Sequence, residues 1–214
     1  MVRYGVNYAD IGGEIVTAPE LSHEVSGEKF YQFKVNARRL SGVEDILPVI
    51  VSERDIIVEE MTLGRTVRID GQIRTYRLYV EADKKDRHVV TVFARDVNLD
   101  AALPNSLNHV VLDGFICKPV MYRVTPLGRE ISDLLIAVNR ANHKSDYIPC
   151  IAWGKHAHRA SRMAVGDQVR LEGRLQSRTY EKLQDDGQVL ERIAYEVSIC
   201  KVETVNGNNQ SNTF

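Results

Sequence analysis

Cysteine is scarce in this sequence, and basic residues are not in excess. The three cysteines among the 214 residues (Cys117, Cys150 and Cys200) are odd in number and form no C-x-x-C pair. Such spacing predicts neither a disulfide framework nor a zinc site, and it fits a reducing cytoplasm. Lys plus Arg number 28 and Asp plus Glu 29, so the net charge of -1 excludes a strongly basic, histone-like protein. A local cationic surface is still compatible with this neutral total.

Long apolar runs are also missing. No stretch of about 18 apolar residues is present, so we expect no transmembrane helix and no membrane partner. Residues 1–10 contain no apolar core of the kind that a signal peptide needs. Hydrophobic residues make up 43% and charged residues 27%, a balance typical of folded domains rather than of disordered chains.

Motifs for catalysis or for cofactor binding are absent from the sequence too. The segment 153–155 (Trp-Gly-Lys) follows no glycine-rich run and is therefore not a P-loop. His156 and His158 lie two residues apart on a predicted helix and would point to different faces, which makes a poor metal site. The segment 185–187 (Asp-Asp-Gly) is typical of a hairpin turn. We expect no enzyme, no catalytic residue, no metal ligand and no cofactor.

What the sequence does contain is an internal repeat at an offset of about one hundred residues. Three pairs of segments match in the same order: 11–15 with 112–116, 48–51 with 149–152, and 64–73 with 166–175. Two domains are therefore predicted, at 1–104 and 105–205. The remaining residues, 206–214, are polar and low in complexity, and we expect them to form a disordered tail.

Each half is predicted to be mainly β-structure. Apolar and polar residues alternate over 169–176 and again over 67–74, which is the period of a half-buried strand. Gly71 and Gly173 fall on the inward side of these strands, and a position without a side chain suits a tight bend at a barrel corner. Further strands are expected at 109–118, 130–139, 146–152 and 193–202.

One helix interrupts the strands of each half. Alanines at helical spacing predict a helix over 155–165, ended by Gly166, and the first half offers 55–63 before Gly64. Five strands with one helix between the third and the fourth describe the OB-fold, a partly open Greek-key barrel. The predicted fold class is mainly all-β, with two tandem OB-fold five-stranded barrels, each with one short helix between strands 3 and 4.

Five stretches of the second half carry a family resemblance. They are His109–Gly114, Thr125–Arg129, Ala137–Arg140, Ala152–Lys155 and Gly166–Tyr180. On these stretches, which span nearly all of 108–203, the second half resembles the bacterial-type single-stranded-DNA-binding protein family. The first half is similar to that family only in its strand pattern, its glycines and the repeat. The resemblance implies binding of single-stranded DNA with little sequence preference, in DNA replication, recombination or repair.

The resemblance also assigns candidate residues for DNA binding. Tyr147, Trp153 and Tyr180 stand where the family has aromatic rings that stack on bases, whereas Asn142 stands at a further such place and has no ring. Strand parity puts Tyr147 and Trp153 on one side of a strand. The candidate set is Trp153, Tyr147, Tyr180, Lys155, Arg140, Arg174, Arg178 and Arg123. The alternative is that the rings pack in the core or its rim and that the cations are ordinary solvated charges.

The first half lacks these rings, because Ile46, Ser52 and Leu78 stand at the matching positions. Residues 1–107 carry 14 basic and 17 acidic side chains, against 14 and 12 in 108–214. The electrostatic attraction of DNA therefore favours the second half as the DNA reader. We expect the first half to serve assembly. The alternative is that it binds DNA through a different set: Tyr31, Arg38, Arg39 and Tyr76.

The resemblance has implications for partners as well. The family commonly presents four OB-folds per assembly, which implies a homodimer of this two-barrel chain, in the cytoplasm with the nucleoid. Family members commonly end in an acidic tip that recruits replication and repair proteins, whereas no Asp or Glu follows Glu203 here. A second function therefore stays open, that of an OB-fold accessory, primosome-like protein acting mainly through protein–protein contacts.

Overall fold

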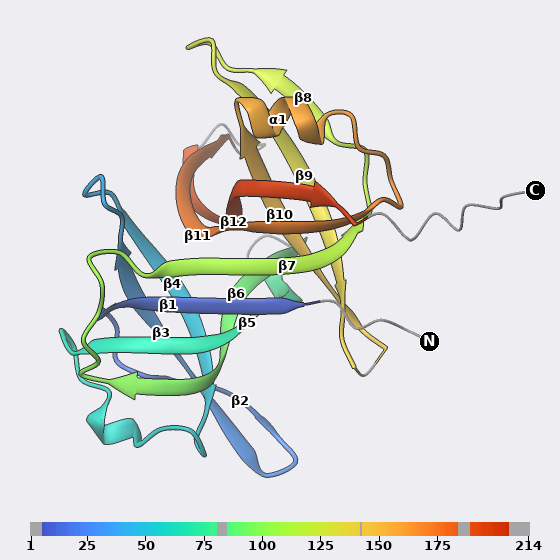
Figure 1. Cartoon of the computed structure of the whole chain (residues 1–214). Coiled ribbons are helices and arrows are strands. Elements are labelled where there is room, and N and C mark those ends of the chain that lie inside the picture. The colour runs from blue at the N-terminus through green and yellow to red at the C-terminus, as the bar shows by residue number, and fades with distance from the viewer. Residues whose placement is uncertain (1–5, 81–84, 142, 184–188, 206–214) are drawn as a thin grey trace, which may run out of the picture.

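The computed structural model describes residues 6–80, 85–141, 143–183 and 189–205 (Figure 1). Three sequence predictions fall outside these ranges: the missing ring at Asn142, the turn at 185–187 and the disordered tail at 206–214. None of the helices formed by the described residues is long and apolar enough to cross a membrane.

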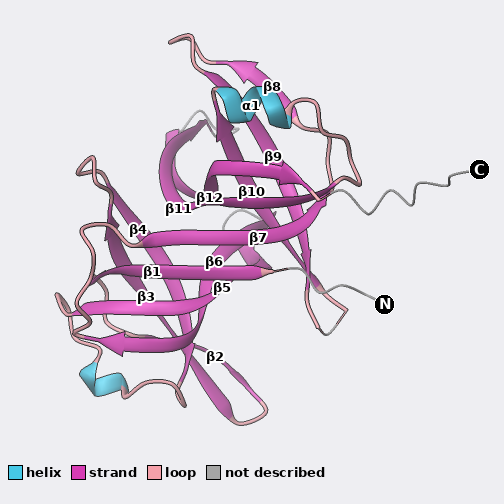
Figure 2. Ribbon diagram, in the orientation of Figure 1, coloured by secondary structure: helices cyan, strands magenta, loops and turns pink. Residues whose placement is uncertain are grey.

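Strands make up most of the described chain (Figure 2). The elements of the first half are β1 (Asn7–Ile15), β2 (Glu20–Val25), β3 (Glu28–Arg38), β4 (Glu44–Ser52), the 3-10 helix η1 (Val58–Glu60), β5 (Thr66–Val80) and β6 (Lys85–Leu99). The second half repeats this order with β7 (Asn108–Ile116), β8 (Met121–Val124), β9 (Glu130–Asn139), β10 (Ser145–Trp153), α1 (Lys155–Ala160), β11 (Gln168–Leu183) and β12 (Val189–Thr204).

Each half closes a five-stranded barrel. In the first half the strands follow the order β3-β4-β6-β5-β1, and the pairing of β3 with β1 closes the ring. In the second half the order is β9-β10-β12-β11-β7, closed by the pairing of β7 with β9. β2 and β8 are added at the two outer edges. With a helical turn between the third and fourth barrel strands of each half, the predicted pair of tandem OB-folds is confirmed.

The two inward glycines lie at bulges, as their parity predicts. The pairing register shifts between Asp70 and Gly71 on β5 and between Glu172 and Gly173 on β11. A Cβ atom on Gly173 would lie 2.3 Å from a backbone oxygen of β12, so the partner strand approaches too closely for any side chain. The bulges bend the two long hairpins around their barrels.

The helices are shorter than the sequence predicts. The helix expected over 155–165 ends at Ala160. Ala157 and Ala160 are buried against the barrel, whereas Ala164, the third alanine at helical spacing, is exposed, so a further helical turn would bury nothing there. Gly166 therefore does not end that helix; it lies in the following turn with φ 95°. In the first half the expected 55–63 helix is reduced to the three residues of η1, none of them buried. The β-branched run that precedes Glu59 disfavours a longer helix.

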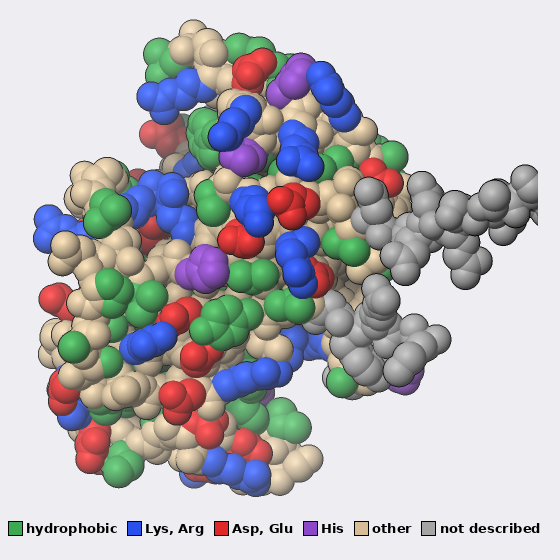
Figure 3. Space-filling view, in the orientation of Figure 1, with side chains coloured by type: hydrophobic (Ala, Val, Ile, Leu, Met, Phe, Trp, Pro, Cys, Tyr) green, Lys and Arg blue, Asp and Glu red, His purple; other side chains and the backbone are tan. Residues whose placement is uncertain are grey.

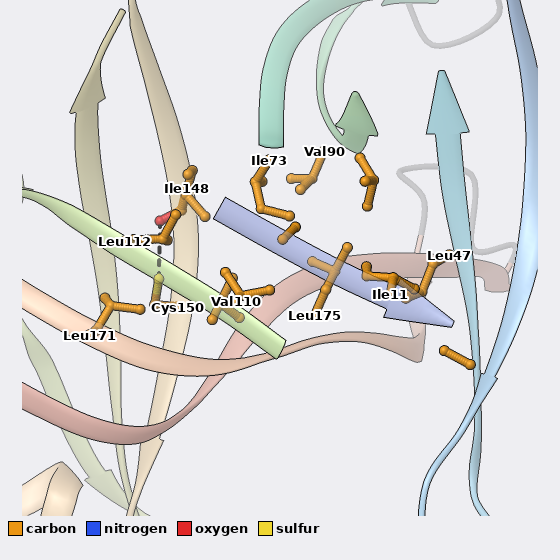
Figure 4. Packing of buried hydrophobic residues seen from close by; sticks show 14 of the residues in the cluster. Ile11, Leu47, Ile73, Val90, Val110, Leu112, Ile148, Cys150, Leu171 and Leu175 are labelled. Atoms are coloured by element: carbon orange, nitrogen blue, oxygen red, sulfur yellow. Dashed lines mark hydrogen bonds between the residues drawn. The ribbon is translucent and has the colours of Figure 1, made fainter. Parts of the chain in front are cut away.

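The two barrels share one sheet and one hydrophobic core. β1 and β7 run side by side as antiparallel neighbours, with Asn7 opposite Leu112 and Ile11 opposite Asn108, which joins both barrels in a 12-stranded sheet (Figure 1). Buried side chains of both halves pack along these two strands (Figure 4). The predicted boundary near residue 104 lies between β6 and β7, and the standing of the halves as separate domains stays a prediction.

Candidate nucleic-acid interface

Two aromatic rings project from one side of β10 in the second barrel. The side chains of Ile148, Cys150 and Ala152 point inward and are at most 3% exposed, whereas Tyr147 is 47% and Trp153 36% exposed. Six residues of strand separate the two rings, a distance of about 20 Å. The parity predicted for these two residues is therefore the one that the strand adopts.

A third ring lies on β11, together with a cation. Tyr180 is 37% exposed. The guanidinium carbon of Arg178 lies 5.7 Å from the centroid of the Tyr180 ring, within the range of a cation–π contact. Arg178 is also paired with Glu196 at 3.5 Å, and its side chain is still 54% exposed. Ring and charge thus stand together at the surface, as a base and its phosphate require.

Trp153 lines an open groove at the end of β10. The other residues that line it are Val124, Gly128, Arg129, Glu130 and Gly154, and its volume is about 560 Å³. Gly154 has φ 52°, and this left-handed turn leads directly into Lys155, the exposed first residue of α1. The ammonium group of Lys155 therefore belongs to a residue only two positions along the chain from the Trp153 indole.

The other three cations of the candidate set are engaged elsewhere. Arg123 lies on the edge strand β8 and forms an exposed ion pair with Asp133 at 2.9 Å. Burial lowers the pKa of Arg174, and the nearby Arg39 guanidinium lowers it further. Arg174 donates from Nη2 to Gln176 Oε1 at 3.3 Å, whereas its Nε atom has no hydrogen-bond partner among the described residues. The candidate cations are therefore not one continuous patch.

Arg140 is bonded to a buried carboxylate. Its Nε donates to Asp146 Oδ2 at 2.7 Å and its Nη2 group donates to Oδ1 and, at 3.2 Å, to the carbonyl oxygen of Thr75. Arg74 adds a bond from Nη1 to Asp146 Oδ2 at 2.9 Å. Asp146 is completely buried. We call Asp146, Arg140, Arg74 and Thr75 the Asp146 network.

The other half of the molecule repeats this arrangement. Arg39 donates to Asp45 through Nε at 2.6 Å and through Nη2 at 2.7 Å, and this pairing raises the pKa of Arg39. Ser177 donates its backbone N–H to Asp45 Oδ1 at 2.9 Å. We call Asp45, Arg39 and Ser177 the Asp45 network. Sequence reasoning missed both networks, although the recurrence of an Arg and an Asp six residues apart in each half of the repeat was a visible signal.

The first barrel has no ring at the positions that match those of the second. Ile46 is half-buried, Ser52 is buried against Glu28, and Leu78 is 50% exposed. Of the alternative binding set, Tyr31 packs against the core and Arg39 belongs to the Asp45 network. The structure therefore does not bring that set together.

A groove of about 700 Å³ lies on the first barrel and extends to Arg140 of the second, and it was not predicted. It is lined by Ser22, His23, Gln32, Ile50, Arg74, Thr75, Tyr76, Leu78, Thr91, Phe93 and Arg140. Tyr76 and Leu78 give it an apolar wall, and burial raises the pKa of the Tyr76 hydroxyl. On the face shown in Figure 3, Lys and Arg gather over the second barrel, whereas Asp and Glu are more frequent over the first. No cluster of three potential metal ligands occurs within the described ranges.

Comparison with known proteins identifies the second barrel. Residues 107–205 match the model of the single-strand binding protein family. A single-stranded DNA-binding protein of Oceanobacillus iheyensis is 33% identical over 115 residues, which cover 49% of this chain and 70% of that protein. Single-stranded DNA-binding protein 3 of Listeria innocua is 32% identical over 123 residues, covering 50% of this chain and 76% of that protein. The chain belongs to the single-strand binding protein family.

Membership confirms the family predicted from the sequence. The proteins of this family are non-enzymatic DNA-binding proteins, which agrees with the expectation of a protein without catalytic activity. The chain spans only about half, 52%, of single-stranded DNA-binding protein 2 of Listeria innocua, at 34% identity over 82 residues. The family match begins at residue 107, so the first barrel lies outside it.

The fold, in contrast, is shared over the whole chain. The wild-type single-stranded DNA binding protein from Thermus aquaticus superposes with a TM-score of 0.75, covering 98% of both chains at 21% sequence identity. At this identity the likeness concerns the fold alone. The tandem arrangement of the two barrels is therefore found in another single-stranded DNA-binding protein.

Proposed function

We propose that this chain binds single-stranded DNA with little sequence preference, through the second barrel. The observation that carries the proposal is the exposure of Tyr147, Trp153 and Tyr180 at the surface of the barrel, at 47%, 36% and 37%. Every base has a π-face, so stacking on such rings is tolerant of sequence. Arg178 and Lys155 are the cations that the geometry best supports as phosphate contacts. Arg123, on the edge strand β8, would contribute a further phosphate contact. Arg140 and Arg174 would bond to side chains of the protein rather than to DNA.

The biological setting proposed is DNA replication, recombination or repair in the cytoplasm, at the nucleoid. Family membership and the names of the relatives support it. Recruitment of replication or repair proteins stays a prediction.

The test is a titration with oligo-dT, followed by Trp153 fluorescence. The chain contains one Trp, so quenching reports directly on the proposed surface. With two or three phosphates neutralised, the slope of log K against log salt should be about -1.4 to -2.1, since each phosphate contributes about -0.7 on a single strand. Absence of quenching by a folded protein would contradict DNA binding at this surface.

A homodimer is proposed as the assembly, giving four barrels. It rests on the number of OB-folds that the family commonly presents, and on the two barrels found in this chain. Sedimentation equilibrium distinguishes a mass near 24 kDa from one twice as large.

A second function follows from the groove of the first barrel. Its exposed Tyr76 and Leu78 favour a protein partner, as in a primosome-like accessory protein. If the Leu78→Asp variant lost a protein contact but kept its affinity for oligo-dT, both functions would coexist in one chain. A folded protein without affinity for DNA would leave this second function alone.

A further inference from the structure

Tyr147 lies on a part of β10 that only one strand of its own barrel supports. β9 pairs with β10 along its whole length, from Ser145 to Trp153. On the other edge, β12 pairs only with Cys150–Ala152. The hydrogen-bond partner of Tyr147 on that edge belongs to the first barrel: the Tyr147 backbone N–H donates to Thr75 Oγ1 at 2.9 Å.

The hydroxyl that accepts this bond is itself fixed in place. Thr75 is 8% exposed, and its backbone N–H donates to Asp146 Oδ1 at 2.7 Å. The carbonyl oxygen of Thr75 accepts from Arg140, which is also bonded to Asp146. The Asp146 network therefore anchors β5 of the first barrel to the start of β10 over two adjacent residues, Asp146 and Tyr147.

The molecule contains a copy of this junction in which no ring is at stake. Ser177 stands where Thr75 does, and its hydroxyl accepts the backbone N–H of Ile46 at 3.2 Å. Ile46 lies on β4, which pairs with β3 along one edge. On the opposite edge, β4 pairs with β6 only at Val49 and Ile50. The two junctions thus share two bonds, one from a backbone N–H to the buried carboxylate and one from a backbone N–H to a hydroxyl. The residue held by the second bond is Tyr147 in one junction and Ile46 in the other.

We propose that Thr75 is a positioning residue for DNA binding: the first barrel fixes the backbone of Tyr147, and hence its ring, for stacking on a base. The inference rests on the proposed function of the second barrel. It gives the first barrel, which lacks rings at the matching positions, a part in DNA binding without a contact to DNA. A strand edge without a partner frays, and an aromatic platform on a fraying edge would spend part of its time away from the stacking geometry.

The experiment compares three variants of the full chain. Thr75→Val keeps the shape and removes the acceptor, Thr75→Ser keeps the hydroxyl, and Ser177→Ala removes the equivalent hydroxyl from the other junction. We expect Thr75→Val to weaken binding of oligo-dT about fivefold or more, bounded by the loss in Tyr147→Ala, since one stacked base contributes about 1–3 kcal/mol. Thr75→Ser and Ser177→Ala should bind as the wild type does.

A spectroscopic readout separates positioning from general destabilisation. In a Tyr147→Trp, Trp153→Phe background the single Trp stands at position 147, so quenching at saturating oligo-dT reports stacking there. Thr75→Val should reduce this quenching, and Ser177→Ala should not. If Thr75→Val does not fold, Thr75→Ala removes the same acceptor without adding an apolar branch.

Each outcome is decisive. Wild-type affinity and full quenching in a folded Thr75→Val or Thr75→Ala protein would overturn the positioning role, as would equal losses in Thr75→Val and Ser177→Ala. A Thr75→Ser protein that binds as weakly as Thr75→Val would overturn it too. If the wild type itself does not bind oligo-dT, the proposed function fails, which is a different result from any of these.

Discussion

Exposed rings are the residues on which the proposed DNA surface depends. We expect Trp153→Ala and Tyr180→Ala each to weaken oligo-dT binding by about 1–3 kcal/mol, the usual contribution of one stacked base. Both rings are more than a third exposed, so the thermal midpoint should change little. Binding of the Trp153 variant is followed by anisotropy of a labelled oligonucleotide, since its own fluorescence is lost.

Tyr76→Ala is the matched control, because Tyr76 is similarly exposed, at 39%, but stands on the first barrel. It should leave the affinity unchanged. A loss as large as that of Trp153→Ala would show that the first barrel also contacts the strand.

The three cysteines should differ in their rates of alkylation. Burial raises the pKa of the Cys150 thiol, and it also raises the pKa of the Cys117 thiol, which is only partly buried. Cys200, in contrast, is exposed. A raised pKa keeps a thiol protonated at neutral pH, and the thiolate is the nucleophile. We expect iodoacetamide at pH 8 to modify Cys200 first in the folded protein, as measured by peptide mass spectrometry. Faster modification of Cys150 would mean that this part of the core opens.

At the level of single residues, the sequence predicted which rings would be exposed but not what the cations would do. The parity of Tyr147 and Trp153 is a local property of one strand. One of the acceptors of Arg140, the carbonyl oxygen of Thr75, is 65 residues away in the other barrel. No period or spacing within one strand carries that information.

At the scale of elements, the bulges are the features that shape the hairpins. Gly173→Ala would place a Cβ atom 2.3 Å from the Ser198 oxygen, and Gly71→Ala would place one 2.4 Å from the Phe93 oxygen. We expect each substitution to lower the free energy of unfolding by about 1–3 kcal/mol, as is usual for overpacking. Urea denaturation followed by circular dichroism measures the loss. An unchanged midpoint in both variants would show that the strands can move apart at the bulge without cost.

The elements themselves were predicted unequally well. Strands with a clear alternation of apolar and polar residues, β5 and β11, were found where expected. The helices were overestimated, because a glycine after an alanine-rich segment marks a turn without fixing where the helix before it ends. The extra edge strands β2 and β8 were not predicted, since their exposed residues have no apolar face to reveal them.

At the scale of the whole molecule, the two barrels should unfold together. Their core is continuous, β1 pairs with β7, and both buried carboxylates are bonded across the junction. We expect one calorimetric transition, with equal calorimetric and van't Hoff enthalpies. Two resolved transitions would show that the barrels are energetically separate and that the shared sheet contributes little.

The two-barrel organisation was visible in the sequence because a repeat is a long-range signal that needs no contact to be seen. How the barrels are joined was not visible. Strand pairing between β1 and β7 depends on which edges are left free once each barrel has closed, and this is a property of the topology rather than of either strand.

The seam between β1 and β7 has a consequence for behaviour on dilution. Two separate one-barrel chains that met through such a seam would come apart as their concentration fell below the dissociation constant. Here the two strands belong to one polypeptide, so their encounter is intramolecular and independent of concentration. The paired barrels, and with them the bond from the Tyr147 N–H to Thr75, should therefore persist at every dilution at which the chain stays folded.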